Sequence, residues 1–217
     1  MTPDERRDFI VGNTTPGTAP IVPEITLLVG GLAMPLWEQG ALADDRPAVP
    51  PPYWAWPWAG GQALARFVLD HPAIANGRSV ADIGAGGGIV AIAAALVGAR
   101  EVAAIDIEAF AVEACRLNAA ANGVTVAVSE ADPTGTDEGW EVVLAGDLWY
   151  ESELAARMEP WLRSLAARGA TVLIGDLGRA YLPAEGLVEL AHYTVPTTDD
   201  LEDAASKEVR VFRVLGG

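Results

Sequence analysis

The sequence is poor in the residues that form disulfides and metal centres. Its 217 residues include one cysteine, Cys115, and two histidines, His71 and His192. One cysteine excludes an intrachain disulfide, and two histidines in unrelated contexts leave little from which to build a zinc site. We therefore expect no metal ion, and we expect Cys115 to be a small buried residue of a helix.

Basic residues are scarce as well. The chain has 14 lysines and arginines, of which only Lys207 is a lysine, against 30 acidic residues, so its net charge is −16. Because nucleic acids bind mainly through lysine and arginine, this balance argues against a nucleic-acid partner. A basic protein or peptide is a compatible partner, although an acidic surface also serves solubility alone.

Long apolar runs are also missing. No uninterrupted stretch reaches the length of about 18 apolar residues that a membrane span needs, and residues 1–7 lack the apolar core of a signal peptide. We therefore expect a cytoplasmic protein without membrane contact. The chain can bury one sizeable core, and we divide it into an N-terminal extension with a tryptophan-rich cap (1–58) and a main domain (59–217).

A glycine-rich turn is the most informative feature that the sequence does contain. Residues 79–98 hold a short apolar stretch, a turn and a run of small residues, which predict a strand, a loop and a helix. Glycine lets the backbone turn sharply and approach a ligand closely. The turn contains Gly84, Ala85, Gly86 and Gly88, and Asp82 precedes it.

Asp106 adds a second carboxylate at the end of the next predicted strand. Two carboxylates at the ends of neighbouring strands suit a ligand with hydroxyl and ammonium groups, which favours S-adenosylmethionine as cofactor. The run Gly86–Ala91 also fits the dinucleotide fingerprint G-x-G-x-x-G/A, and Asp106 lies 18 residues after Gly88, near the spacing of a ribose-binding acid. A nicotinamide or flavin cofactor therefore stays open at this point.

From residue 79 onward, apolar strands alternate with helices, which predicts a parallel sheet covered on both faces. The strands are expected at 79–83, 101–106, 124–129, 141–146 and 170–175, and the helices at 62–70, 88–98, 108–122 and 151–167. Two further extended runs, 187–195 and 208–215, predict an antiparallel hairpin. Seven strands with a terminal antiparallel hairpin are typical of the class I S-adenosylmethionine-dependent methyltransferase fold, a Rossmann-like α/β fold, rather than of a dinucleotide dehydrogenase.

The first 50 residues carry weaker patterns. Seven prolines punctuate them, and we expect irregular structure with a short helix near 4–11, a strand at 25–29 and a proline-containing loop at 41–52. The tryptophan-rich run 53–58 follows this loop, and it ends at Trp58.

A second cluster of polar and aromatic residues follows the strand at 141–146. Asp147, Trp149, Tyr150 and Glu151 come directly after it, and ligands of open α/β sheets bind outside the carboxyl ends of the strands. The apolar run has already ended at Ala145, so we expect Asp147 and Tyr150 to serve catalysis, and Trp149 and Glu151 to bind substrate. The alternative is that these residues only begin a helix and pack.

Two more strand ends contribute polar residues to the same edge. Asp132 follows the third strand of the sheet, where it is placed to reach a bound adenine amino group. Asp176 and Arg179 follow the fifth strand. They can form an ion pair that shapes the rim or contact the substrate directly, and the sequence leaves both alternatives open.

Together these segments resemble the seven-β-strand protein lysine methyltransferases. The matching pieces are Val22–Ile25, Pro52–Ala55, Trp58–Leu64, Val80–Gly88, Gly146–Glu151 and Val172–Asp176 with Gly178-Arg179. The resemblance covers about residues 22–183, and it is closest to the members that methylate the β-subunit of electron transfer flavoprotein. One departure is that Ala59 follows Trp58, where the family usually has a proline.

The resemblance implies a protein substrate, S-adenosylmethionine as methyl donor, and Trp58 closing over that cofactor. Backbone around Gly84–Gly86 would hold the methionine moiety, Asp82 would orient its ammonium group, and Asp106 would accept from the ribose hydroxyls. An aromatic channel of Trp149 and Tyr150 would attract the lysine cation. Asp147 would orient its amine. A small-molecule methyltransferase is the second hypothesis, and a nicotinamide oxidoreductase or a binding module without activity is the third.

Overall fold

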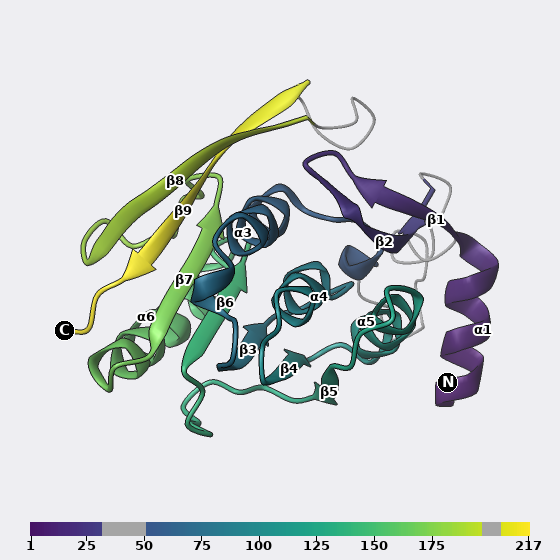
Figure 1. Ribbon diagram of the computed structural model, residues 1–217, viewed down its shortest axis with the longest axis horizontal. Coiled ribbons are helices and arrows are strands. Elements are labelled where there is room, and N and C mark those ends of the chain that lie inside the picture. The colour runs from purple at the N-terminus through teal and green to yellow at the C-terminus, as the bar shows by residue number, and fades with distance from the viewer. Residues whose placement is uncertain (32–50, 197–204) are drawn as a thin grey trace.

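The computed structural model describes residues 1–31, 51–196 and 205–217. Its central element is a seven-stranded sheet in the order β5-β4-β3-β6-β7-β9-β8 (Figure 1). Five neighbouring strands are parallel, whereas β9 is antiparallel to both β7 and β8. The strands are β3 (Ser79–Ile83), β4 (Glu101–Asp106), β5 (Ala127–Glu130), β6 (Val142–Gly146), β7 (Thr171–Asp176), β8 (Leu187–Pro196) and β9 (Ser206–Val214). This topology confirms the class I methyltransferase fold.

Helices cover both faces of the sheet, as the apolar strands predict. The helices α3 (Ala59–Asp70), α4 (Ile89–Leu96) and α5 (Ala109–Ala121) pack on one face, and α6 (Ser152–Ala167) packs on the other. Successive residues of β3 serve opposite faces: Val80 joins the core under α3 and α4, and Ala81 joins the core under α6. The predicted helix and strand ranges therefore agree with the structure to within a few residues.

The N-terminal segment is more regular than the sequence predicts. The helix α1 (Pro3–Asn13) covers the expected range, but it leads into an antiparallel ribbon of β1 (Thr14–Ala19) and β2 (Val22–Gly30). The prediction of irregular structure over 14–24 was wrong because it took the prolines as breakers. Both strands of a two-stranded ribbon have a free edge, where a missing N–H is tolerated. The expected loop at 41–52 lies mostly outside the described residues.

This ribbon shares its core with the main sheet. Val22, Ile25 and Leu27 are buried in the same apolar cluster as α3, α4 and the strands beneath them. Two short 3-10 helices, η1 (Tyr53–Ala55) and η2 (Pro72–Ile74), flank α3 along the chain. Residues 1–31 are therefore packed against the catalytic fold rather than separate from it.

Three glycines, Gly60 in α3 and Gly146 and Gly175 in the sheet, bring α3 close to the sheet. A Cβ on Gly60 would lie 2.4 Å from the carbonyl oxygen of Gly175, and one on Gly146 would lie 2.9 Å from the Cα of Gly61. No side chain fits between these backbones, so the first turn of α3 rests directly on the ends of β6 and β7. Gly60 of the tryptophan motif is therefore the residue of α3 whose missing side chain permits this approach.

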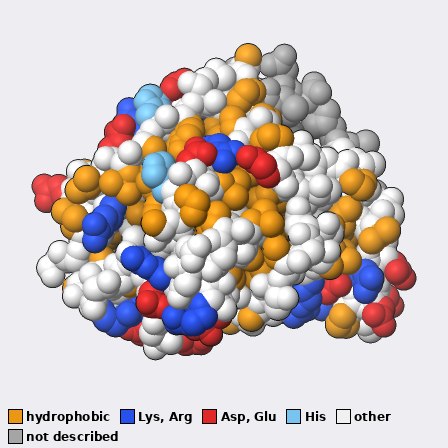
Figure 2. All heavy atoms as spheres, viewed as in Figure 1, with side chains coloured by type: hydrophobic (Ala, Val, Ile, Leu, Met, Phe, Trp, Pro, Cys, Tyr) orange, Lys and Arg blue, Asp and Glu red, His pale blue; other side chains and the backbone are white. Residues whose placement is uncertain are grey.

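The surface reflects the composition. Figure 2 shows apolar side chains over the middle of one face, around α3 and α4, with one group of acidic and basic side chains among them and further charged side chains of both signs towards the edge. Within the described ranges, no helix combines the length and apolar character that a membrane span requires.

Candidate functional site

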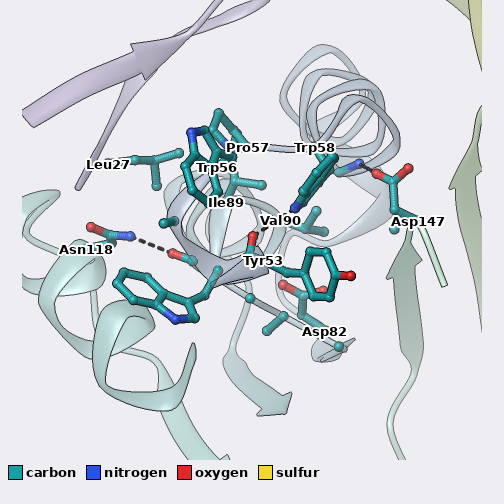
Figure 3. A pocket seen from close by; sticks show the side chains of 18 of the residues that line it. Leu27, Tyr53, Trp56, Pro57, Trp58, Asp82, Ile89, Val90, Asn118 and Asp147 are labelled. Carbon is teal, nitrogen blue, oxygen red and sulfur yellow. Dashed lines mark hydrogen bonds between the residues drawn. The ribbon is translucent and has the colours of Figure 1, made fainter. Parts of the chain in front are cut away.

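The candidate site is a cavity at the carboxyl ends of the parallel strands. The strand order reverses at β3, which pairs with β4 on one side and β6 on the other, and open α/β sheets bind ligands at such a point. Walls come from β2, from residues 53–58, from the glycine loop and from the end of β6 (Figure 3). The predicted site residues among its lining are Trp58, Asp82, Gly84, Ala85, Gly86 and Asp147.

The glycine loop uses its own amides to hold its shape. The N–H groups of Gly84 and Ala85 donate to the carbonyl of Ile105, and that of Gly88 donates to Ala85. Gly84 and Gly88 have φ of 64° and 83°, a conformation that other residues rarely adopt. A Cβ on Gly88, which caps α4, would also lie 2.5 Å from Sγ of Cys115, which is buried as expected.

The side chain of Asp82, a residue of β3, lies at the N-terminus of α4. Its Oδ2 accepts from the N–H of Ala91 at 2.9 Å, and its side chain is 1% exposed. The pKa of Asp82 is raised to about 8, mainly by burial; the Ala91 hydrogen bond opposes this shift, and the nearby Asp106 carboxylate adds to it. A helix N-terminus that already faces a carboxylate has no place for a pyrophosphate.

Asp106 braces the glycine loop from the neighbouring strand. Its Oδ2 accepts from the N–H of Gly86 at 2.8 Å, and its Oδ1 accepts from the N–H of Glu108 at 2.9 Å. Asp106 does not line the cavity directly, but each carboxylate oxygen retains a further lone pair. Burial raises the pKa of Asp106, and burial followed by repulsion from Asp106 raises the pKa of Glu108 to about 8.

This electrostatic arrangement fits a cationic ligand. Asp82, Asp106 and Glu108 are three carboxyl groups whose ionised form is disfavoured by burial, and the repulsion among them adds to that cost. S-adenosylmethionine carries a sulfonium and an ammonium group, which would relieve this repulsion, whereas the phosphates of a dinucleotide would increase it. The residues present therefore fit the predicted cofactor, and Asp82 and the loop 84–86 line the cavity.

Asp147 lies at the junction of three elements. It follows β6 with φ of 58°, its Oδ2 accepts from the N–H of Gly61 in α3 at 2.9 Å, and its Oδ1 accepts from Nη2 of Arg179 at 3.1 Å. Burial raises the pKa of Asp147 to about 6, although Arg179 and the Gly61 hydrogen bond lower it. Asp147 therefore caps α3 and faces the cavity, so it serves the fold as well as the site.

Aromatic rings form the outer wall next to Asp147. The ring of Tyr53 lies 5.9 Å from Trp58 and 6.4 Å from Tyr150, centroid to centroid, and Nε1 of Trp58 donates to the Tyr53 carbonyl at 2.8 Å. Tyr53 and Tyr150 are each about half exposed. Figure 3 shows Tyr53 and Trp58 on the side of the cavity towards Asp147, with Leu27 and Asn118 on the other side.

Six predicted residues do not line the cavity. Gly88, Asp106 and Tyr150 are next to residues that do, whereas Trp149, Asp132 and Glu151 have other surroundings. Trp149 is 1% exposed and packs in the core under α6, because the chain after β6 turns that side chain inward, so the expected channel of Trp149 and Tyr150 does not form. Asp132 is exposed, pairs with Arg157 and accepts from the N–H of Thr134 at 3.0 Å. Glu151 is exposed at the start of α6 and does not line the cavity.

Sequence reasoning missed Tyr53 and Asn118. Asn118 in α5 is buried, donates through Nδ2 to the carbonyl of Gly87 at 2.8 Å, and accepts through Oδ1 from the N–H of Leu28 at 2.8 Å. An asparagine within an alanine-rich helix is the signal that could have singled it out. Tyr53 was visible only as part of the tryptophan-rich run.

Comparisons with known proteins show to which family the chain is related. The family of ribosomal protein L11 methyltransferase (PrmA) matches residues 63–148. Electron transfer flavoprotein beta subunit lysine methyltransferase of Xenopus laevis is 38% identical over 208 residues, which cover 93% of this chain and 81% of that protein. The protein of the same name in Danio rerio is 35% identical over 218 residues, with 97% and 83% coverage.

A solved structure supports the fold alone. The ribosomal protein L11 methylase of Lactobacillus delbrueckii subsp. bulgaricus superposes with a TM-score of 0.53 at 23% identity, covering 72% of this chain and 78% of that one.

Proposed function

Since the chain belongs to the electron transfer flavoprotein β-subunit lysine methyltransferase family, we propose that its substrate is a lysine-bearing region of that β-subunit. The chain is an S-adenosylmethionine-dependent protein lysine methyltransferase. The observation that carries the proposal is the match along nearly the whole chain, and the site supports it independently.

The cavity joins two environments that lysine methylation needs. Its inner part presents carboxyl groups and glycine backbone that suit the cationic methyl donor, and its outer part presents Tyr53, Trp58 and Asp147. When bound, S-adenosylmethionine supplies a methyl group on a sulfonium, which is transferred by in-line displacement. Most of the catalysis is therefore positioning and exclusion of water.

The protein has to deliver the lysine amine without its extra proton. Lysine has a reference pKa near 10.4, so it arrives as an ammonium ion. The exposed rings of Tyr53 and Tyr150 attract that cation through their π faces, and leaving water lowers its pKa. We assign the aromatic wall to Tyr53, Trp58 and Tyr150, in place of the buried Trp149.

Asp147 receives the ammonium group and aims the amine. Its pKa of about 6 keeps it ionised at neutral pH and makes it a better proton acceptor than an ordinary carboxylate. One lone pair of each oxygen is used by Gly61 or Arg179, which leaves the others for the lysine. We propose that Asp147 takes the ammonium proton, and that an oxygen of its carboxyl group accepts a hydrogen bond from a remaining N–H once the amine has rotated, which turns the nitrogen lone pair towards the methyl donor.

The test incubates purified β-subunit with labelled S-adenosylmethionine and locates the label by mass spectrometry. We expect methylation of defined lysines, which decreases as salt rises, because a chain at −16 attracts a basic patch and salt screens that attraction. Asp147→Asn, which keeps the side-chain shape, should lose most of the activity. An untouched β-subunit together with a methylated free amine would favour a small-molecule methyltransferase.

We keep the cytoplasm as the proposed location, since a single cysteine requires no oxidising compartment.

A further inference from the structure

Behind Asp147 lies a second layer of buried charge. Arg179, in the loop after β7, donates from Nη2 to Oδ1 of Asp147 at 3.1 Å. Asp176, the last residue of β7, is fully buried, and its Oδ1 accepts from the backbone N–H groups of Gly178 and Arg179, both at 2.7 Å. Asp176 therefore folds the loop back and fixes the point from which the Arg179 side chain starts.

Arg179 and Asp176 are held apart. Nε of Arg179 lies 4.0 Å from Oδ2 of Asp176, and in the described part of the chain both of these buried atoms lack a hydrogen-bond partner. A guanidinium and a carboxylate this close would normally form two parallel hydrogen bonds. The guanidinium of Arg179 donates to Asp147 instead and does not form this pair of hydrogen bonds with Asp176.

We propose that Arg179 is a positioning residue for the methyl acceptor, because its guanidinium holds the Asp147 carboxylate turned towards the cavity. The proposal rests on the lysine methylation described above. Arg179 approaches Asp147 from the β7 side, Gly61 approaches from the α3 side, and the two contacts fix both carboxylate oxygens. The remaining lone pairs of the Asp147 carboxylate then point towards the cavity, where they can accept hydrogen bonds from an incoming lysine.

The charge of Arg179 has a separate consequence. Asp147 faces the guanidinium of Arg179, the carboxylate of Asp176 and the N-terminus of α3. Burial and Asp176 raise the pKa of Asp147, and Arg179 is the main influence that lowers it. Without Arg179 the carboxyl of Asp147 would bind a proton near neutral pH, and it would then lose the negative charge that attracts a lysine ammonium and the capacity to take its proton.

Arginine and lysine at this position separate the two effects. Arg179→Gln removes the charge, whereas Arg179→Lys keeps the charge but loses the planar fork that sets direction. Arg213→Gln is the matched control, since Arg213 is exposed on β9 and its replacement changes the net charge equally. Far-ultraviolet circular dichroism and S-adenosylmethionine affinity report whether each variant keeps the fold.

The decisive measurement is the pH profile of kcat/KM for methylation of the β-subunit. Activity falls when Asp147 is protonated, so the acid limb follows its pKa. In Arg179→Gln we expect this limb to move to higher pH by about 1–3 units, with at least a tenfold loss at pH 7. In Arg179→Lys the acid limb should stay within about half a pH unit of its wild-type position, while kcat/KM falls at least fivefold. Arg213→Gln should change neither the acid limb nor kcat/KM.

Carboxyl ¹³C NMR of the enzyme without substrate tests the role of Arg179 without depending on the identity of the methylated protein. The resonance that Asp147→Asn removes should titrate at higher pH in Arg179→Gln than in wild type. If this shift occurs and the β-subunit is not methylated, only the proposed substrate fails. An unmoved resonance and acid limb would overturn the role of Arg179, and so would wild-type kcat/KM in Arg179→Gln. If that variant does not fold, wild-type kcat/KM in Arg179→Lys would overturn it.

Discussion

The two adjacent glycines of α3 have opposite surroundings, so the same substitution should act in opposite directions. A Cβ on Gly60 would lie 2.4 Å from the Gly175 carbonyl oxygen and 2.5 Å from Oδ2 of Asp147, whereas one on Gly61 would meet only Cγ2 of Ile89 at 3.6 Å. Neither glycine has a positive φ. Alanine in a helix is otherwise favoured over glycine by about 0.5–1 kcal/mol.

Gly61→Ala should therefore stabilise the protein by roughly 0.5–1 kcal/mol, because a 3.6 Å contact is ordinary packing. Gly60→Ala gains the same helix preference, but its overlap falls on a backbone oxygen that cannot rotate away. Overpacking costs about 1–3 kcal/mol, and the upper end applies here. The expected net loss is about 2 kcal/mol.

Thermal unfolding measured by calorimetry checks this pair. For a chain of this size 1 kcal/mol corresponds to roughly 2–4 °C, so Tm should fall by about 4–8 °C in Gly60→Ala and rise by about 1–4 °C in Gly61→Ala. Methylation should also fall in Gly60→Ala, since the new Cβ displaces the Asp147 carboxylate. A Tm at or above wild type in Gly60→Ala would refute the reasoning from backbone approach.

Two further predictions concern carboxyl groups of the site. Asp147→Ala should have a lower Tm than Asp147→Asn, because asparagine tolerates φ of 58° and still accepts from Gly61, whereas alanine does neither; equal Tm values would contradict the capping role. Asp82 ionises at about 4 in the unfolded chain and at about 8 in the folded protein, so the folded state binds the extra proton between these values. Stability of the protein without cofactor should consequently fall as pH rises from about 4 to 8, by at most about 1.4 kcal/mol per pH unit from this group. Denaturant titrations should show a flatter dependence in Asp82→Asn, and an unchanged slope would argue against the raised pKa.

The central strands β3, β6 and β7 could be predicted from the sequence because burial on both faces makes them mostly apolar. The loop at 84–88 was equally visible, since only glycine tolerates its positive φ angles. The strand expected at 25–29 is part of β2, but β1 and the start of β2 were missed because Pro16 and Pro23 hide strands whose free edges tolerate them.

The candidate site was predicted less completely, for a geometric reason. A position after a strand places a residue near the site but does not fix the direction of its side chain. Trp149 and Tyr150 are neighbours in the chain, yet one is buried in the core and the other is half exposed beside Tyr53. Asp132 is likewise at a strand end, but Arg157 of α6 pairs with it. Such partners come from distant segments, and no local pattern records them.

Asn118 makes the shape of the cavity depend on the N-terminal ribbon. Its amide joins the carbonyl of Gly87 to the N–H of Leu28, so the ribbon and the glycine loop meet at one side chain. Leu27 and Leu28 both line the cavity, and a shift of one residue in the pairing of β1 with β2 would exchange the faces on which they lie. Related enzymes can therefore evolve a different cavity wall by altering a surface hairpin, while every residue of the glycine loop stays the same.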